Sequence, residues 1–294
     1  MGKPYSIVRF MKYAPYKIKE DEALQSGVIK FTLEVITPLH VGSGMQFIDE
    51  RNSIYKAFYK WNGRYAIPGA TLKGCIRGVA ESISHSCLSG KFIEIKKEGE
   101  KKKKVEYFPS VNKRENNGRC IICDMFGSMG IKSKINVSQL LFEKGEAYTE
   151  LLPSFKNPHI TESMLEDGKL IGYRFYHHGK INILQKGDVP FEVIKQGSTF
   201  SGKLHYKDLS QEELQLLCFS LGFSGDISLK LGYGKPAYFG SVRLKPDDEK
   251  YVEIAKAYKN TSDPEIKQAI TQLCEILDYK NAKLKSEWNE DGTY

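Results

Sequence analysis

Hydrophobic and polar residues alternate along residues 28–36, which predicts a strand that runs into Thr37-Pro38 and a glycine loop. Residues 54–58 and 64–67 have short extended patterns, and an Asn-Gly turn signal lies between them, so we expect a hairpin there. A Pro-Gly pair then opens residues 70–84, where apolar residues recur at helical spacing. The pattern of residues in the first half of the chain therefore predicts a strand, a hairpin and a core helix.

The second half repeats the strand and helix patterns. Ser210 and Glu213 form a capping box that opens a helix over residues 214–221. The stretches predicted as strands here are 135–142, 199–206, 226–231 and 238–244. A strand–helix–strand order in both halves predicts an α+β fold with a ferredoxin-like core, either single or duplicated, of the kind that underlies RNA-recognition domains.

The composition changes along the chain and suggests a division into regions. After residue 246 the sequence becomes charged and helical, which predicts a C-terminal helical tail over 247–294 appended to a domain over 1–246. Residues 91–119 contain ten Lys or Arg and few apolar residues, so they are predicted to be a basic insertion, either a solvated loop or an RNA-gripping element. Residues 153–186 lack a clear period but are rich in aromatic residues, which predicts a thumb-like excursion rather than disorder.

The net charge is +8, with 44 basic and 36 acidic residues. Residues 247–294 hold 7 Lys against 11 Asp and Glu, so the rest of the chain carries +12. A basic body fits a polyanionic partner, although it also fits simple solubility. No stretch has the roughly 20 apolar residues needed to span a bilayer and no signal peptide is evident, so we expect a cytoplasmic protein.

Four stretches carry a family resemblance: TPLHVGSG at 37–44, IPGATLKGCIR at 67–77, CIICDMFGS at 120–128 and LGYGKPAYFGSV at 231–242. In this order they resemble the opening motif, the PGSSLKGxxR helix start, the C-x-LFG motif and the glycine-rich loop of the RAMP superfamily of CRISPR proteins. Residues 172–178, GYRFYHH, are similar to a GxKFYxHH stretch of some type III RAMP proteins.

The resemblance implies a backbone-type subunit of a type III CRISPR effector complex. Its implied partners are crRNA, target RNA, and other subunits that include neighbouring RAMP proteins. Lys73 and Arg77 lie four residues apart near a helix N-terminus, which favours phosphate contact over the alternative of two solvated charges. The predicted RNA-binding residues are His40, Gly42, Ser43, Gly44, Gly69, Thr71, Lys73, Arg77, Gly127, Ser128, Gly234 and Lys235.

The cysteines suggest a metal site rather than disulfides. Cys120 and Cys123 have zinc-knuckle spacing, and His85 and Cys87 stand on the other side of the basic insertion, so the four make one candidate Cys3His zinc site. A structural zinc would pin the two ends of that insertion. Comparable zinc sites occur in some RAMP backbone subunits, and Cys75 is an alternative to His85.

Two other interpretations of the cysteines stay open. The CxxC spacing is either a ligand pair or a coincidence, and a redox dithiol would need a thioredoxin-like unit with a helix that starts between the cysteines, which the sequence does not show. Cys75, Cys218 and Cys274 lie in apolar helical patterns that are typical of packed thiols.

Catalysis rests on Asp49. In target-cleaving RAMP subunits an Asp in the loop after the first strand supports cleavage that depends on Mg²⁺ or Mn²⁺, and Asp49 has the matching position. Glu50-Arg51-Asn52 follow it, where the family has a small polar residue and a Pro. His40 is the alternative acid or base. The competing functions are a non-catalytic capping or structural subunit and a stand-alone CRISPR RNA-processing endoribonuclease, for which His85 would be the candidate histidine.

Overall fold

The main β-sheet of this computed structural model has eight strands, with the order β17-β18-β2-β16-β10-β6-β5 and with β9 also paired to β16. The structure describes residues 3–48, 50, 52–87, 119–128, 130–152, 164–166, 169–180 and 189–284, and the backbone of 93–95 and 103–105. The strands are β2 (Gln25–Val35), β5 (Lys60–Trp61), β6 (Arg64–Ile67), β9 (Ile135–Val137), β10 (Leu140–Lys144), β16 (Thr199–Leu209), β17 (Leu229–Lys230) and β18 (Ser241–Pro246).

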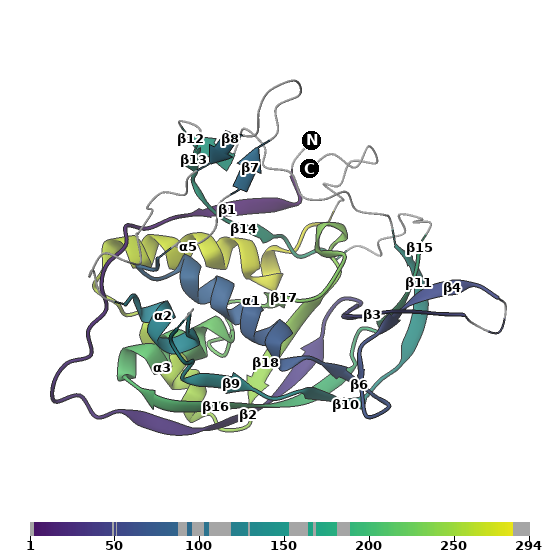
Figure 1. Cartoon of the computed structure of the whole chain (residues 1–294), viewed down its shortest axis with the longest axis horizontal. Helices are drawn as coiled ribbons and strands as arrows, with labels where there is room; N and C mark the ends of the chain where they lie inside the picture. The colour runs from purple at the N-terminus through teal and green to yellow at the C-terminus, as the bar shows by residue number, and fades with distance from the viewer. Residues whose placement is uncertain are drawn as a thin grey trace.

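The helices cover one face of this sheet. They are α1 (Gly69–Ser82), α2 (Ile121–Phe126), α3 (Gln211–Ser220), α4 (Lys250–Tyr258) and α5 (Pro264–Leu277), with short 3-10 turns at η2 (Lys235–Ala237) and η3 (Tyr279–Asn281). Figure 1 shows α1, α3 and α5 on the same side of β2 and β16. Ser210 caps α3 in a capping box with Glu213, as predicted.

The chain order β2-α1-β10-β16-α3-β18 and the spatial order β18-β2-β16-β10 together form one β-α-β-β-α-β unit. All three strand pairs in it are antiparallel. The α+β class and the ferredoxin-like core are therefore confirmed, with a single such unit in the main sheet.

Apolar and polar residues alternate along β2, which explains why the face of the sheet toward the helices is buried. Every second residue from Ile29 to Val35 is buried, and β16 faces it in register, with Gly202 opposite Phe31. A Cβ atom at Gly202 would lie 2.6 Å from the Phe31 ring, so glycine leaves the space that the ring fills. The core thus lies between the sheet and the helices.

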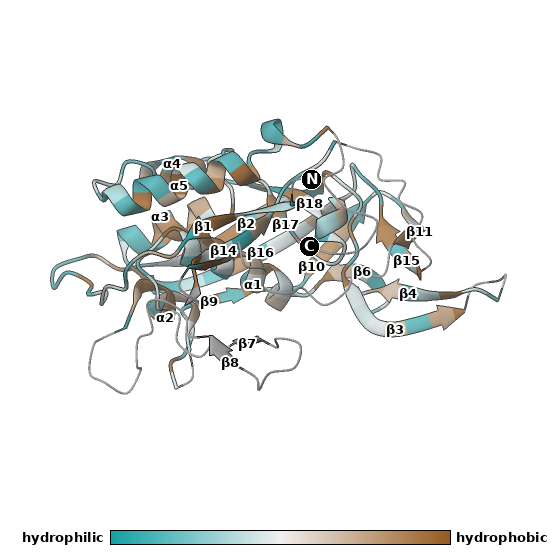
Figure 2. Cartoon of the chain, turned by 90° about the horizontal axis from the view of Figure 1, so that it is seen from above, coloured by the Kyte–Doolittle hydropathy of each residue, from teal (hydrophilic) through white to brown (hydrophobic). Residues whose placement is uncertain are grey.

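A second, four-stranded sheet has the order β11-β15-β4-β3. Its strands lie in segments that are inserted between the elements of the core unit. Its strands are β3 (Gly42–Ile48), β4 (Ile54–Phe58), β11 (Ala147–Leu152) and β15 (Val189–Ile194). The hairpin of β3 and β4 projects from the body, and Figure 2 shows the far end of β3 coloured as hydrophobic.

Three small ribbons complete the described structure. They are β1 (Tyr5–Arg9) with β14 (Gly172–Tyr176), β12 (Leu165–Glu166) with β13 (Lys169–Leu170), and β7 (Ile93–Ile95) with β8 (Lys103–Val105). The last ribbon falls in the predicted basic insertion. The rest of that insertion up to residue 118, and residues 153–163 and 181–186 of the predicted excursion, lie outside the described residues.

Three predicted elements differ from the observed ones. The strand predicted over 135–142 is split, because Ser138 engages the backbone of Lys203 with both its N–H and its hydroxyl. The Asn62-Gly63 turn joins β5 to β6 rather than β4 to β6. The strand predicted over 226–231 shortens to β17.

The two C-terminal helices pack on the core. Tyr251, Ala255 and Tyr258 of α4 and the apolar face of α5 belong to the same buried cluster as the main sheet. The Tyr258 hydroxyl donates to the carbonyl of Ile83 at the end of α1, 2.8 Å away. Within the described residues, no helix is long and apolar enough to cross a membrane.

Candidate nucleic-acid interface and metal centre

The first and last of the four motif stretches form one structure. The Thr37 hydroxyl donates to the carbonyl of Tyr238 at 2.9 Å and accepts from the N–H of Ser241 at 2.9 Å. The N–H of Gly240 donates to the carbonyl of Pro38 at 2.8 Å. These bonds join segments about 200 positions apart in the sequence.

Gly232 shows how close the two segments lie. Its φ angle is +73°, and a Cβ atom there would stand 2.0 Å from the carbonyl oxygen of His40. The next residue, Tyr233, donates its N–H to that same oxygen at 2.9 Å. Only glycine fits this approach.

His40 is a buried support rather than an exposed contact. Its ring is 3% exposed, donates from Nδ1 to the carbonyl of Glu192 at 2.7 Å, and packs edge-on against Phe191. Burial lowers the pKa of His40, which keeps the ring neutral. The predicted RNA-contacting role is therefore corrected to a structural one beneath Gly42, where a Cβ atom would lie 3.3 Å from His40 Nε2.

Gly42, Ser43 and Gly44 open β3 with accessible backbone. Gly42 and Gly44 are exposed, and Gly44 has φ +81° with no atom near the place of a Cβ. The Ser43 hydroxyl donates to the carbonyl of Ala57 at 3.1 Å and accepts from the N–H of Met45. The Ser43 side chain thus fixes the loop, while the main chain at Gly42 and Gly44 stays exposed to solvent.

Two glycines in the N-terminal half of α1 differ in their surroundings: Gly69 packs against a strand, and Gly74 faces open space. A Cβ atom at Gly69 would lie 2.0 Å from the carbonyl oxygen of Val137, so Gly69 serves helix–strand packing. Thr71 is half-buried, whereas Gly74 is exposed with nothing within 4 Å of a Cβ position. Exposed helix backbone is therefore found at Gly74 rather than at the predicted Gly69.

Lys73 and Arg77 are both half-buried and bonded within the chain. Lys73 Nζ donates to the Ser133 hydroxyl at 2.7 Å and to the carbonyl of Ile135 at 2.9 Å. Arg77 pairs through Nε with Glu81 at 2.9 Å. Burial, and then the charge of Arg77, lowers the pKa of Lys73. Neither side chain is a freely solvated charge, which was the alternative to the predicted phosphate contact.

Gly127 and Ser128 form a tight turn after α2. Gly127 has φ +79°, and a Cβ atom there would lie 2.7 Å from the carbonyl oxygen of Ile131. Ser128 and Ile131 exchange two main-chain hydrogen bonds of 3.1 and 2.8 Å. The glycine is needed for this backbone geometry.

Gly234 and Lys235 belong to the glycine-rich loop over the buried end of β17. Gly234 is buried with φ +77°, and Lys235 is half-buried. Lys230 lies beneath them, with its Nζ 3.3 Å from the Ser241 hydroxyl. Burial, and then the charge of Lys235, holds the pKa of Lys230 well below its usual value.

Three of the four predicted metal ligands come together. The Sγ atoms of Cys87, Cys120 and Cys123 lie within 4.8 Å of one another, at 3.4 Å for Cys87–Cys123 and 3.6 Å for Cys87–Cys120. Zn–S bonds of about 2.3 Å in a tetrahedral site place thiolate sulfurs about 3.8 Å apart. The donor set and its spacing therefore fit a zinc ion.

Neither predicted fourth ligand is in this group. Both His85 ring nitrogens are bonded elsewhere, Nδ1 to the carbonyl of Lys12 at 2.6 Å and Nε2 to the Asp263 carboxylate at 2.9 Å. Cys75 donates its thiol to the carbonyl of Lys230 at 3.6 Å. The described ligand set is thus corrected to three thiols.

The expectation that no helix begins between the CxxC cysteines is wrong. Cys120 is the N-cap of α2, and its sulfur accepts from the N–H of Cys123 at 3.4 Å. The third thiol, on Cys87, nevertheless lies against both cysteines, which a metal site explains and a simple dithiol does not.

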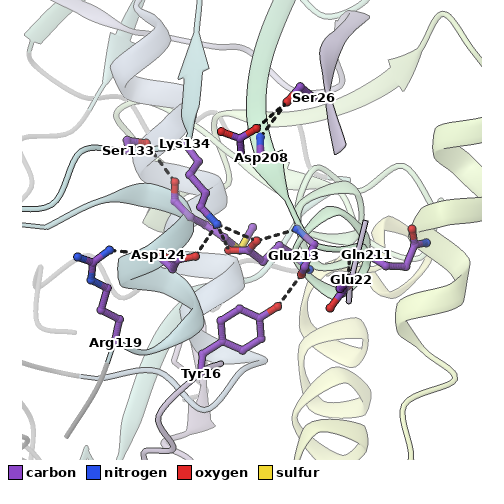
Figure 3. A network of polar contacts seen from close by, with 12 residues as sticks. Tyr16, Glu22, Ser26, Arg119, Asp124, Ser133, Lys134, Asp208, Gln211 and Glu213 are labelled. Carbon is purple, nitrogen blue, oxygen red and sulfur yellow. Dashed lines mark hydrogen bonds and ion pairs between the residues drawn. The ribbon is translucent and has the colours of Figure 1, made fainter. Parts of the chain in front are cut away.

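An ionic network anchors the cysteine helix (Figure 3). Asp124 pairs with Lys134 at 2.5 Å, and Lys134 also contacts the buried Glu213 at 3.2 Å. Burial raises the pKa of Glu213 to about 7, although the Ser210 N–H and the Lys134 ammonium both act to lower it. Sequence patterns suggested Glu213 only as a helix cap, because its contact with Lys134 is a tertiary one.

Asp49 lies outside the described residues. Ile48 precedes it at the end of β3 and pairs with Ile54, the first residue of β4. Both side chains are exposed, at 66% and 57%. The candidate catalytic residue thus follows the outer end of the projecting hairpin.

Glu192, which the sequence did not single out, and His178, the last residue of the GYRFYHH stretch, are buried polar residues. Glu192 on β15 accepts from the Tyr65 hydroxyl and from the N–H of Phe58. His178 bonds through Nδ1 to the Ser241 hydroxyl at 2.8 Å. The signal of Glu192 in the sequence is weak, because a lone polar residue in a strand looks like a surface position, and the resemblance of 172–178 gave His178 no structural role.

The family model of the RAMP superfamily matches residues 32–243. The match spans all four motif stretches and runs from within β2 to within β18, so it covers most of the β-α-β-β-α-β unit. A search of the curated proteins finds no match.

Proposed function

The chain belongs to the RAMP superfamily, and from this premise we propose that it is a guide-RNA-binding backbone subunit of a type III CRISPR ribonucleoprotein. Membership implies a CRISPR-associated RNA-binding role. The finer proposal adds crRNA as the bound guide, target RNA as its complement, and neighbouring subunits as protein partners.

The convergence of the four motif stretches on α1 carries this proposal. Arg77 of α1 reaches the carbonyl of Gly127, and Cys75 of α1 reaches the carbonyl of Lys230 just before the glycine-rich loop. That loop in turn holds the carbonyl of His40. Segments spread over two thirds of the chain are thus linked to α1, either directly or through the glycine-rich loop, and this supports one shared binding surface.

The chemistry around α1 suits a phosphate backbone. Gly42 and Gly44 present open main chain, Gly74 leaves space for a close approach to α1, and Lys235 adds positive charge. Main-chain N–H groups and basic side chains bind phosphates without reading bases, so sequence would be left to base pairing with the guide.

We further propose that Cys87, Cys120 and Cys123 hold a structural zinc. Three thiolates at tetrahedral spacing would bind the ion, and the ion would join the end of the α1 segment to α2 across the basic insertion. Arg77 contributes nearby positive charge: burial acts to lower the pKa of its guanidinium, but the ion pair with Glu81 raises it overall.

Target cleavage is the second candidate function. Asp49 follows Ile48 in the sequence, and Ile48 is an exposed residue at the end of β3, where it pairs with Ile54. A carboxylate there is an oxygen ligand that suits Mg²⁺ or Mn²⁺, or would orient the attacking ribose hydroxyl.

Purification of the chain from cells that carry a CRISPR array, followed by sequencing of bound RNA, tests the main proposal. We expect guide RNAs with repeat-derived 5′ tags. Recovery of unrelated RNA, or of none, would contradict guide binding. Cleavage of repeat RNA by the purified chain alone would instead identify a processing endoribonuclease.

A further inference from the structure

The face of the main sheet that points away from the helices is open. Along β2 the outward residues Val28, Lys30 and Thr32 are exposed, and along β16 Lys203 and His205 are exposed. In Figure 1 the helices that cover β2 and β16 all lie on the other side, and no described element covers this one.

Positive charges on this outer face cross three neighbouring strands. Lys30 on β2 stands directly opposite Lys203 on β16. Lys245 on β18 is opposite Thr32, two residues along β2 from Lys30. Adjacent strands are about 4.8 Å apart, so the three lysines span roughly 10 Å. We call Lys30, Lys203 and Lys245 the outer stripe.

The centre of the outer stripe has no internal counter-charge. Like charges directly opposite on paired strands destabilise a sheet. Lys245 pairs weakly with Glu34 at 3.7 Å, but Lys30 and Lys203 have no carboxylate within 4 Å among the described residues. An external anion would remove the repulsion between them.

The side chains around the outer stripe favour a polyanion over a protein surface. Protein interfaces have an apolar or aromatic centre, whereas the neighbours here are mostly polar, namely Thr32, Ser201 and His205, with Val28 as the apolar exception. Two carboxylates also reach this face, Glu34 beside Lys245 and Glu143 bonded to the Ser201 hydroxyl, and neither pairs with Lys30 or Lys203. No Phe, Tyr or Trp ring lies on the described outward positions of β2, β16 and β18, and His205 is the one imidazole there, so most of the contact would be with phosphates.

We propose that the outer stripe is a second RNA-binding surface, which holds the phosphate backbone of an RNA strand independently of its sequence. The inference rests on the proposed RNA-binding function and places a contact on the opposite face of the sheet from α1. An RNA strand that crosses the sheet would contact β18, β2 and β16 in turn.

Fluorescence anisotropy of labelled mixed-sequence RNA, titrated with the full chain at several KCl concentrations, tests the proposal. Lys30→Thr/Lys203→Thr removes the central pair and keeps β-favouring residues. Lys267→Ala/Lys280→Ala is the matched control, because it removes two exposed lysines from α5 and η3 on the helical side. We expect the sheet variant to bind roughly 10- to 30-fold more weakly at about 0.1 M KCl, with a salt slope lower by about 1.4, and the control to bind as wild type does.

Each other outcome overturns the inference in a distinguishable way. Equal weakening in both variants would mean that only net charge matters. Wild-type affinity in the sheet variant would reject the outer stripe and leave guide binding by α1 intact, and a loss of subunit assembly with unchanged RNA affinity would identify a protein interface. Absence of RNA binding by the wild-type chain would reject the proposed function as well.

Discussion

The guanidinium of Arg77 donates from Nη1 to the main-chain carbonyl of Gly127, 3.1 Å away. This bond joins two of the family's motif stretches, while Nε of the same group pairs with the buried Glu81. Arg77 therefore links α1 to the turn after α2. Any contact that it makes with a phosphate would be additional to this structural role.

Arg77→Ala should lower the free energy of unfolding by about 1–2 kcal/mol, because a buried carboxylate loses its ion pair and a carbonyl loses a donor. Urea denaturation measures this. Arg64→Ala is the control, since exposed Arg64 also donates to a carbonyl, that of Phe142 at 3.0 Å, without a carboxylate partner among the described residues. Equal losses in the two variants would show that the Glu81 pair adds nothing.

Gly74→Ala should make the chain more stable and a weaker RNA binder. Alanine favours a helix interior over glycine by up to about 1 kcal/mol, and a methyl group at Gly74 meets no atom within 4 Å. The same methyl group would cover the open backbone that is proposed to face phosphates. Thermal unfolding and RNA anisotropy give the two readouts.

Two glycines on the same helix serve as controls. Gly78→Ala also has open space, so it should stabilise the chain to a similar extent and leave RNA affinity unchanged. Gly69→Ala should destabilise it strongly, because its Cβ would stand 2.0 Å from the Val137 carbonyl oxygen. A stabilised Gly74→Ala protein with wild-type RNA affinity would remove this backbone from the binding surface.

The purified chain should contain about one zinc ion, bound in part by the three thiols. Cys120→Ser and Cys123→Ser should each reduce the zinc content and the melting temperature, because the ion contributes folding free energy. Elemental analysis and thermal melts measure both. Cys274→Ser, at a half-buried thiol of α5, should keep the zinc. Zinc-free protein with unchanged melting in the CxxC variants would dismiss the site.

His178 should make the chain sensitive to acid. Its Nδ1 bonds to the Ser241 hydroxyl, and its Nε2 lies 3.2 Å from the carbonyls of Ser228 and Leu277, so the ring is fixed among buried groups. Burial, and then the charge of Lys230, lowers the pKa of His178 to about 3. Because the unfolded state binds the proton near pH 6.5, stability is lost as the pH falls below that value, by about 2 kcal/mol at pH 5.

Urea denaturation at neutral pH and at pH 5 tests this. His178→Gln should lose less stability between the two conditions than wild type does, whatever its stability at neutral pH. His205→Gln, which changes an exposed histidine of β16, should lose as much as wild type. The same loss in the His178 variant would mean that other groups dominate the acid response.

Local patterns predicted the elements whose causes are local. The alternation along β2, the capping box of Ser210 and the helical spacing of α1 each depend on residues a few positions apart, and the structure confirms them. The split between β9 and β10 was not predictable in this way, because it comes from Ser138 bonding to Lys203 on another strand.

The candidate site shows the same limit. Cysteine spacing indicated three convergent thiols, but Lys12 and Asp263, which are distant in sequence, take both nitrogens of His85. The spacing of Lys73 and Arg77 on α1 suggested that both side chains are exposed. In the structure Lys73 donates a hydrogen bond to Ser133, which lies in a loop outside any helix. Residue types were thus predictable, and their tertiary partners were not.

Asp49→Ala should abolish periodic cleavage of target RNA by the assembled complex and leave guide and target binding nearly intact. A carboxylate that binds a divalent cation or moves a proton acts on the transition state, whereas the grip on RNA comes from the open backbone and basic residues elsewhere. Loss of a negative charge near RNA would, if anything, tighten binding. Cleavage assays with end-labelled target, with Mg²⁺ or Mn²⁺ and then with chelator, measure the effect.

Glu50→Ala provides the matched control, because it removes the neighbouring exposed carboxylate and the same charge from the same hairpin. It should cut at the wild-type rate. Equal losses in both variants would point to the charge or folding of the hairpin rather than to a specific role of Asp49. A wild-type complex that never cuts at regular intervals, or an Asp49→Ala complex that cuts as fast as wild type, would leave the chain as a non-catalytic subunit, for which the hairpin of β3 and β4 has a purely structural use.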